Sequence, residues 1–229
     1  MAALLVAALT AGWATRSDLW TGPLATLGGD QVVPSTGIAG VAHTLPAKQA
    51  HRSGRGTAGG DDLGWSVAAA ARRYLDTAPQ GFRNDCSGFV EAATHRAGAP
   101  LRGSTRQIWQ ASIARGWVHH RRRPRIGDLA FFDDTWDRNG NGRADDDLTH
   151  IAIVIDVQPD GTIVMAHAGS SRGRSTLRMN LFRPGVTAAD DRTLNDHLRR
   201  ASAGRAPVPT LAGELWRGFA TLGNEAVAL

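Results

Sequence analysis

The chain has 229 residues, enough for one catalytic domain with segments left over at its ends, since a domain takes roughly 100 to 200 residues. Hydrophobic residues make up 42% and charged residues 21%, which excludes wholesale disorder and a polytopic membrane protein. The formal net charge of +5 favours anionic partners. The arginines that carry it lie in scattered clusters with few aromatic residues between them, so we expect no nucleic-acid partner.

The two ends of the chain differ from its middle. Residues 1–14 combine a short apolar run with small residues, which predicts a secretory signal peptide and an exported protein, in the periplasm, cell envelope or outside the cell. Their n-region has no Lys or Arg, so a weak anchor stays an alternative. Residues 15–62 are rich in Gly, Ala, Thr, Ser and Pro and predict a flexible linker. We expect the catalytic domain over 63–184 and a C-terminal extension over 185–229, with an amphipathic helix around 211–222.

Within the catalytic domain, helical patterns come first and strand patterns follow. Three helices are expected, over Trp65–Asp76, Ser87–Ala97 and Thr105–Ala114. The apolar period then changes to two, and three strands are expected, over Gly127–Phe132, Ile151–Val157 and Thr162–Ala168. This order predicts an α+β domain with the helices packed on one side of an antiparallel sheet.

Cys86 is the only cysteine, so no intramolecular disulfide can form, and an unpaired thiol in an exported protein calls for a chemical explanation. It lies at the predicted start of the second helix, where free backbone amides and the positive end of the helix dipole favour thiolate over thiol. A structural cysteine is the alternative. The helix-start position and the polar neighbours favour a nucleophile with a lowered pKa.

A thiol nucleophile needs an imidazole as base, and two histidines have a suitable context. His150 enters an apolar strand and shares one face of it with Ala152 and Val154, while three isoleucines take the other face. His167 lies near the end of the next strand. A tight three-residue turn between the strands would put His167 opposite Ile153 and facing away from His150. A bulge or a longer turn is therefore needed to bring the two imidazoles together.

These residues lie in four segments whose order resembles the NlpC-type cell-wall endopeptidases, which are papain-like cysteine peptidases. The segments are Asp85-Cys86-Ser87-Gly88-Phe89-Val90, Gly127-Asp128-Leu129-Ala130-Phe131-Phe132, Thr149-His150-Ile151-Ala152-Ile153-Val154 and Ala166-His167-Ala168. The resemblance implies hydrolysis of the bond between D-glutamate and a diamino acid in peptidoglycan stem peptides, by a monomer that needs no catalytic cofactor. Nucleophile-bearing helices would pack on a sheet that carries the histidines.

The resemblance also implies roles for individual residues. Cys86 is the nucleophile, His150 its base, and His167 the group that orients His150. Residues matching Asp85 and Ser87 help to hold the free amine of the substrate, and Tyr74 lies near a position where the family often has a substrate-facing tyrosine. The loop before Cys86 departs from the family's glycine-rich pattern, so we expect a different wall of the substrate groove.

Two other functions remain open from the sequence. An amidase or acyltransferase using the same cysteine and histidine would show the same motifs. A non-catalytic wall-binding module is the second alternative, and the presence of all three triad residues disfavours it.

An insertion before His150 has the spacing of an EF-hand-type calcium loop. Its oxygen donors would come from the side chains and one backbone carbonyl of Asp137, Asn139, Asn141, Arg143, Asp145 and Asp147. Gly142 supplies the sharp turn, but the twelfth position is Leu148 and cannot provide the bidentate carboxylate. A solvated acidic turn is the alternative. A metal here would be structural and would brace the strand that carries the base.

Overall fold

The computed structural model describes residues 58–169, 173–199 and 208–223. The predicted signal peptide and nearly all of the predicted linker lie outside these ranges. The first three helices are α1 (Ala58–Asp76), α2 (Cys86–Arg96) and α3 (Thr105–Ala114). All three were predicted, although α1 begins at Ala58, inside the segment expected as linker.

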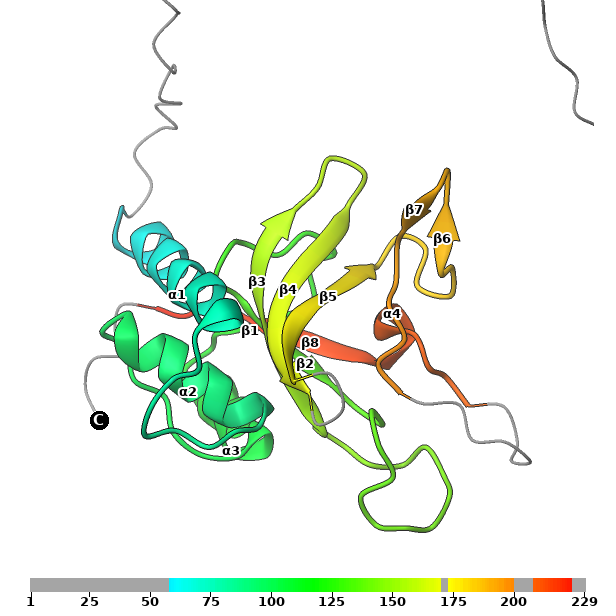
Figure 1. The fold of residues 1–229 in the computed structure, drawn as a ribbon, viewed down its shortest axis with the longest axis horizontal. Coiled ribbons are helices and arrows are strands. Elements are labelled where there is room, and N and C mark those ends of the chain that lie inside the picture. Colours follow the sequence, from blue (N-terminus) through cyan, green and yellow to red (C-terminus); the bar gives the residue numbers. More distant parts are fainter. Residues whose placement is uncertain (1–57, 170–172, 200–207, 224–229) are drawn as a thin grey trace, which may run out of the picture. The chain divides into compact units, whose positions relative to one another are not determined.

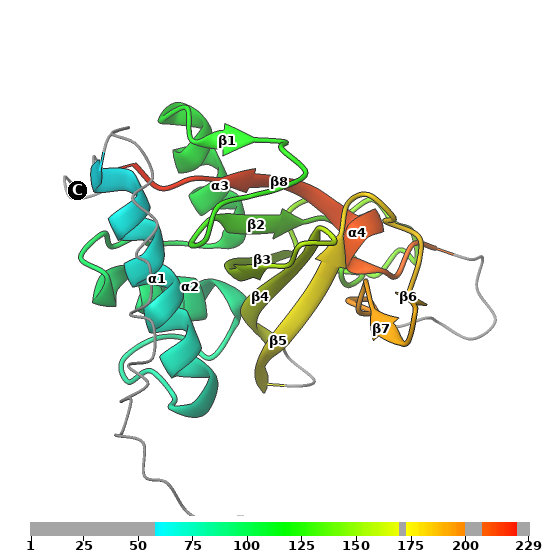
Figure 2. The same ribbon diagram turned by 90° about the horizontal axis from the view of Figure 1, so that it is seen from above.

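Six strands form one antiparallel sheet in the order β1-β8-β2-β3-β4-β5. They are β1 (Val118–His119), β8 (Trp216–Ala220), β2 (Leu129–Phe132), β3 (His150–Val157), β4 (Thr162–Gly169) and β5 (Gly173–Asn180). A separate short hairpin is formed by β6 (Ala188–Ala189) and β7 (Arg192–Thr193), and α4 (Ala212–Leu215) precedes β8. Helices α1 to α3 lie on one side of the sheet and α4 on the other (Figures 1 and 2). The predicted α+β class is therefore confirmed.

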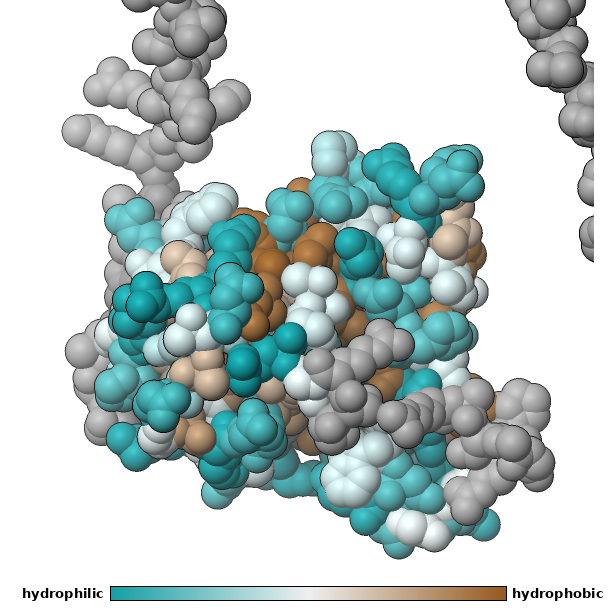
Figure 3. All heavy atoms as spheres, in the orientation of Figure 1, coloured by the Kyte–Doolittle hydropathy of each residue, from teal (hydrophilic) through white to brown (hydrophobic). Residues whose placement is uncertain are grey.

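Both faces of the central strands are buried, which accounts for their apolar sequences. Ile151 and Ile153 of β3 pack with Phe89 of α2 in the core between the helices and the sheet. Val154 points to the other face and packs with Leu215 of α4. The faces of β3 are those that the alternating sequence predicts. The face of the molecule seen in Figure 3 is polar over much of its surface, with apolar residues gathered over β3 and β4 beside α1.

We expected a helix around residues 211–222. Only α4, which ends at Leu215, is helical, and the prediction is wrong for the residues after it. Residues 216–220 form β8 instead, inserted between β1 and β2, so this part of the expected extension belongs to the sheet. Phe219 and Ala220 are fully buried there. Pairing on both edges satisfies the backbone of β8, and Gly218 would weaken a helix by about 1 kcal/mol.

A β-bulge in β3 sets the register that the histidines need. Val157 pairs with Ile163 next to the turn, but Ile153 pairs with Ala166 further along, because Ile155 is an extra residue on its strand. This shift places His167 on the same face as His150. The carbonyl of the bulged Ile155 accepts a hydrogen bond from the Arg72 guanidinium of α1. The bulge that the pairing of the two histidines needs is thus present, and Arg72 of α1 stabilises it.

A close contact between α1 and the loop before β2 explains a glycine of the second motif. Gly127 has φ +88°, and a Cβ at this position would lie 2.2 Å from the carbonyl oxygen of Gly64. Only glycine fits both the backbone conformation and the contact. In the part of the chain that the structure describes, no helix is long and apolar enough to cross a membrane.

Candidate active site

Cys86 is the first residue of α2, as predicted, and Asp85 is the N-cap. One carboxylate oxygen of Asp85 accepts hydrogen bonds from the Gly88 amide at 2.6 Å and from the Ser87 hydroxyl at 2.9 Å. The loop before the helix crosses so closely that a Cβ on Gly88 would lie 2.1 Å from the Arg83 carbonyl oxygen. The motif around the cysteine therefore builds a tightly capped helix start.

A second helix also begins beside the thiol. The hydroxyl of Thr105, the first residue of α3, lies 3.8 Å from Cys86 Sγ. Ser104 and Gln107 form a capping box that fixes this helix start. The N-termini of α2 and α3 thus meet at the sulfur, and both carry partial positive charge. Thr105 was not among the predicted site residues. Its position at the predicted start of a helix was visible, but its contact with a residue 19 positions earlier was not.

The resting state of the thiol differs from the prediction. Burial raises the pKa of Cys86 above that of a free thiol, and the negative charge of Asp85 acts in the same direction. Hydrogen bonding to Thr105 and to the backbone of Ile151 and Ser87 lowers the pKa in part. Burial is the largest of these effects, so the expected low pKa is wrong for the enzyme without substrate. The thiol needs a base to ionise.

His150 and His167 form a buried pair on adjacent strands. His150 Nε2 lies 2.8 Å from His167 Nδ1, and the two rings are nearly perpendicular. The other nitrogen of His167, Nε2, lies 3.1 Å from the hydroxyl of Ser175 on β5. Ser175 was missed because β5 had not been predicted. Because His150 Nε2 contacts His167, Nδ1 is the nitrogen of His150 that remains to accept the thiol proton.

The environment of His150 favours the neutral imidazole. Burial, together with a smaller electrostatic effect of the neighbouring His167, lowers the pKa of His150 to about 3. At neutral pH the imidazole is therefore unprotonated and has a free lone pair, as a general base requires. Cys86 and His150 rest as a neutral thiol and a neutral imidazole.

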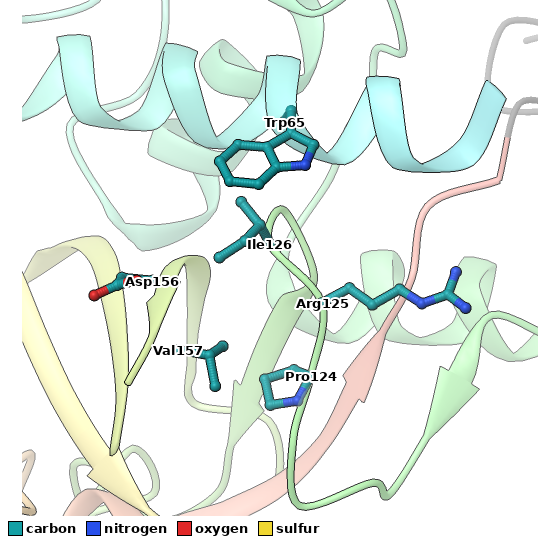
Figure 4. Close-up of a pocket in the computed structure, with 6 residues that line it drawn as sticks. All are labelled: Trp65, Pro124, Arg125, Ile126, Asp156 and Val157. Atoms are coloured by element: carbon teal, nitrogen blue, oxygen red, sulfur yellow. The ribbon is translucent and has the colours of Figure 1, made fainter. Parts of the chain in front are cut away.

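One cleft of about 1110 Å³ brings these groups together. Cys86, His150 and His167 all line it, together with the exposed Trp136 and with Thr105. A smaller hollow of about 410 Å³ lies at the other end of β3, where Trp65 of α1 stands over Ile126 (Figure 4). Its lining residues include no cysteine, histidine, serine or threonine. The larger cleft is therefore the candidate active site.

The three predicted substrate-binding residues have different positions. Asp85 and Ser87 line the cleft, but the N-cap contacts occupy one oxygen of Asp85, and Arg83 donates to the Ser87 hydroxyl at 3.1 Å. The Arg83 guanidinium also lies 4.0 Å from the second oxygen of Asp85. Tyr74 packs against the core beneath α1 and is not among the residues that line the cleft.

The predicted calcium loop folds partly as its spacing suggests. Asp137 accepts a hydrogen bond from the Gly142 amide at 2.8 Å, and the side-chain amides of Asn139 and Asn141 both contact Asp145. Two other predicted ligands are engaged elsewhere. The Arg143 carbonyl accepts a hydrogen bond from Arg199, and Asp147 lies 3.5 Å from Arg217.

Among the residues described, no group of three or more His, Cys, Asp or Glu side chains is placed to hold a metal ion. The predicted ligands are three aspartates, two asparagines and one backbone carbonyl, and calcium binding stays a prediction.

The arrangement at the cleft agrees with a comparison against known protein families. Residues 76–169 match the model of the CHAP domain. The match contains Cys86, His150 and His167, and it identifies a cysteine- and histidine-dependent amidohydrolase or peptidase domain. It also indicates hydrolase activity on peptidoglycan. Ser175 and β8 lie beyond the CHAP match. Neither the curated proteins nor the solved structures contain a match to this chain.

Proposed function

We propose that the protein is an exported, monomeric, papain-like cysteine endopeptidase of the NlpC type. It would cleave the bond between D-glutamate and a diamino acid in peptidoglycan stem peptides, without a catalytic cofactor and without nucleic acid as a partner. The observation that supports this most directly is the cleft in which Cys86 at a helix N-terminus and the His150–His167 pair meet. The CHAP match supports peptidoglycan as the substrate.

In the proposed mechanism, His150 Nδ1 removes the thiol proton as Cys86 Sγ attacks the scissile carbonyl carbon. The new imidazolium keeps its Nε2–H directed at His167 Nδ1, which accepts the hydrogen bond and stabilises the charge. Free amides at the start of α2 stabilise the oxyanion.

His150 then gives its proton to the leaving amine, and the carbon–nitrogen bond breaks. A water molecule, deprotonated by His150, hydrolyses the acyl-enzyme and restores the thiol. Each proton is thus returned within one cycle.

A second candidate is a cell-wall amidase with the same cysteine and histidine. The CHAP match favours it as much as a peptidase, because the family model covers amidohydrolases as well. The two activities differ in the bond that occupies the cleft and share every catalytic step.

Mass spectrometry of purified wall fragments tests the proposal. Digestion by the wild type should release fragments with new termini at the D-glutamyl to diamino acid bond, and Cys86→Ala should release none. New termini at the bond between sugar and stem would assign the amidase activity instead. Equal patterns for wild type and Cys86→Ala would remove the enzymatic proposal.

A further inference from the structure

The cleft is lined by more cations than anions. Four arginines and one acidic residue are among the described residues that line it: Arg83, Arg106, Arg138 and Arg199, with Asp85. Asp85 is engaged as the N-cap of α2. The charge that faces a substrate in this cleft is therefore mainly positive.

Two of the arginines, Arg83 and Arg199, form several hydrogen bonds within the protein. One nitrogen of Arg83, Nη2, donates to Ser87, Glu91 and the Gly103 carbonyl. Arg199 is 8% exposed and donates to the carbonyl oxygens of residues 134 and 143. Neither guanidinium can move to a substrate without breaking these contacts.

The remaining two arginines converge from different elements. Arg106 of α3 and Arg138 of the insertion donate to the same acceptor, the backbone carbonyl of Asp147, at 3.5 and 3.2 Å. Both side chains are exposed at the cleft. The side chain of Asp147 itself contacts Arg217, so its carboxylate does not neutralise the pair through a contact of its own. Asp146 lies 3.7 Å from Arg138 Nε and offsets part of one charge.

The position of this pair relative to the sulfur limits what it can bind. Arg106 directly follows Thr105, whose hydroxyl contacts Cys86 Sγ. Both arginines line the same cleft as Cys86, so a substrate group held by the pair belongs to a residue near the scissile bond. Guanidinium groups recognise carboxylates through paired, charge-assisted hydrogen bonds.

We infer that Arg106 and Arg138 form a carboxylate subsite, which selects substrates with a free carboxylate on the residue at the scissile bond. The inference rests on the proposed function. In a stem cleaved after γ-linked D-glutamate, the free group is the α-carboxylate of that residue. Its carboxamide form has almost the same shape and no charge, so the cleft distinguishes the two by electrostatics.

The test uses two synthetic stem peptides that differ only in this carboxylate or carboxamide. Wild type should cleave the carboxylate peptide with a kcat/KM at least tenfold higher. Arg106→Gln and Arg138→Gln should each lower that ratio toward one, mainly by raising KM for the carboxylate peptide. Arg102→Gln is the matched control, because Arg102 is exposed just before α3 and is not among the residues that line the cleft.

Binding to Cys86→Ala, measured by calorimetry, separates this inference from the proposed function. A tenfold tighter Kd for the carboxylate peptide, lost on adding Arg106→Gln, supports the subsite even if the wild type cleaves a different bond. Equal affinities for the two peptides overturn it even if the wild type is an active endopeptidase. A preference that persists in both arginine variants overturns it as well. Arg106→Lys keeps the charge without the fork and should retain part of the preference.

Discussion

Replacing Thr105 by valine tests whether its hydroxyl stabilises the thiolate of Cys86. The substitution keeps the shape of a side chain that is 6% exposed and removes the hydroxyl 3.8 Å from Cys86 Sγ. A hydrogen bond to a charged group contributes about 1.5 to 3 kcal/mol, and sulfur is a weak partner, so we take the lower end. That corresponds to a rise of about one unit in the pKa of Cys86.

The expected change in reactivity follows from this shift. Below the pKa, a rise of one unit lowers the thiolate fraction about tenfold. The more basic thiolate is about threefold more nucleophilic, because the Brønsted coefficient is about 0.4 to 0.5. Alkylation by iodoacetamide should therefore slow about threefold at neutral pH, and the midpoint of its pH profile should move up by about one unit.

Alkylation rates measured from pH 6 to 11 give both quantities, and Thr105→Ser should restore them. Thr94→Val is the matched control, since Thr94 is a buried threonine on α2 whose hydroxyl bonds backbone groups instead of the sulfur. If Thr105→Val only lowers the melting temperature, as Thr94→Val should, and leaves the alkylation midpoint in place, Thr105 has a packing role and the reasoning is wrong.

Four further outcomes are expected. His150→Ala should abolish peptide cleavage, whereas His167→Asn should leave a measurable rate, because the asparagine oxygen can accept the Nε2–H of His150; inactivity of the second variant with activity of the first would reverse the roles. Between pH 6.5 and about 3 the unfolded chain protonates His150 while the folded chain keeps it neutral, so stability falls as pH falls; wild type should lose about 3 kcal/mol more than His150→Gln between pH 7 and pH 4, and parallel denaturation curves would contradict the buried neutral imidazole. Arg72→Ala should lower kcat, and it should lower the free energy of unfolding by about 1.5 to 3 kcal/mol, because the hydrogen bond to the bulged Ile155 carbonyl is lost. The adjacent Arg73→Ala should change neither quantity much. Equal effects of the two substitutions would show that the bulge does not position His167. Millimolar calcium should raise the melting temperature relative to excess chelator, and Asp145→Asn should abolish the rise; no shift, with unchanged activity, would leave the insertion as a solvated turn.

Local patterns were sufficient for the elements that carry the chemistry. The helical period predicts α2 and α3, and Cys86 lies at the start of α2 as expected. The alternation in β3 predicts which side chains share a face with His150. These features depend on residues only a few positions apart, so the sequence by itself determined them.

Contacts between distant segments decided the rest. The register that brings His167 to His150 depends on one extra residue at Ile155, and the alternation of side chains is the same with or without it. Strand β8 lies between β1 and β2 and forms hydrogen bonds with both of them. The sequence of residues 216–220 alone does not predict these partners, because they lie far away in the chain. Thr105 meets Cys86 only after two helices pack side by side. The sequence thus determined which groups could react, whereas the backbone pairing and helix packing of the folded chain decided their distances and charge states, because both depend on burial and on partners far away in the chain.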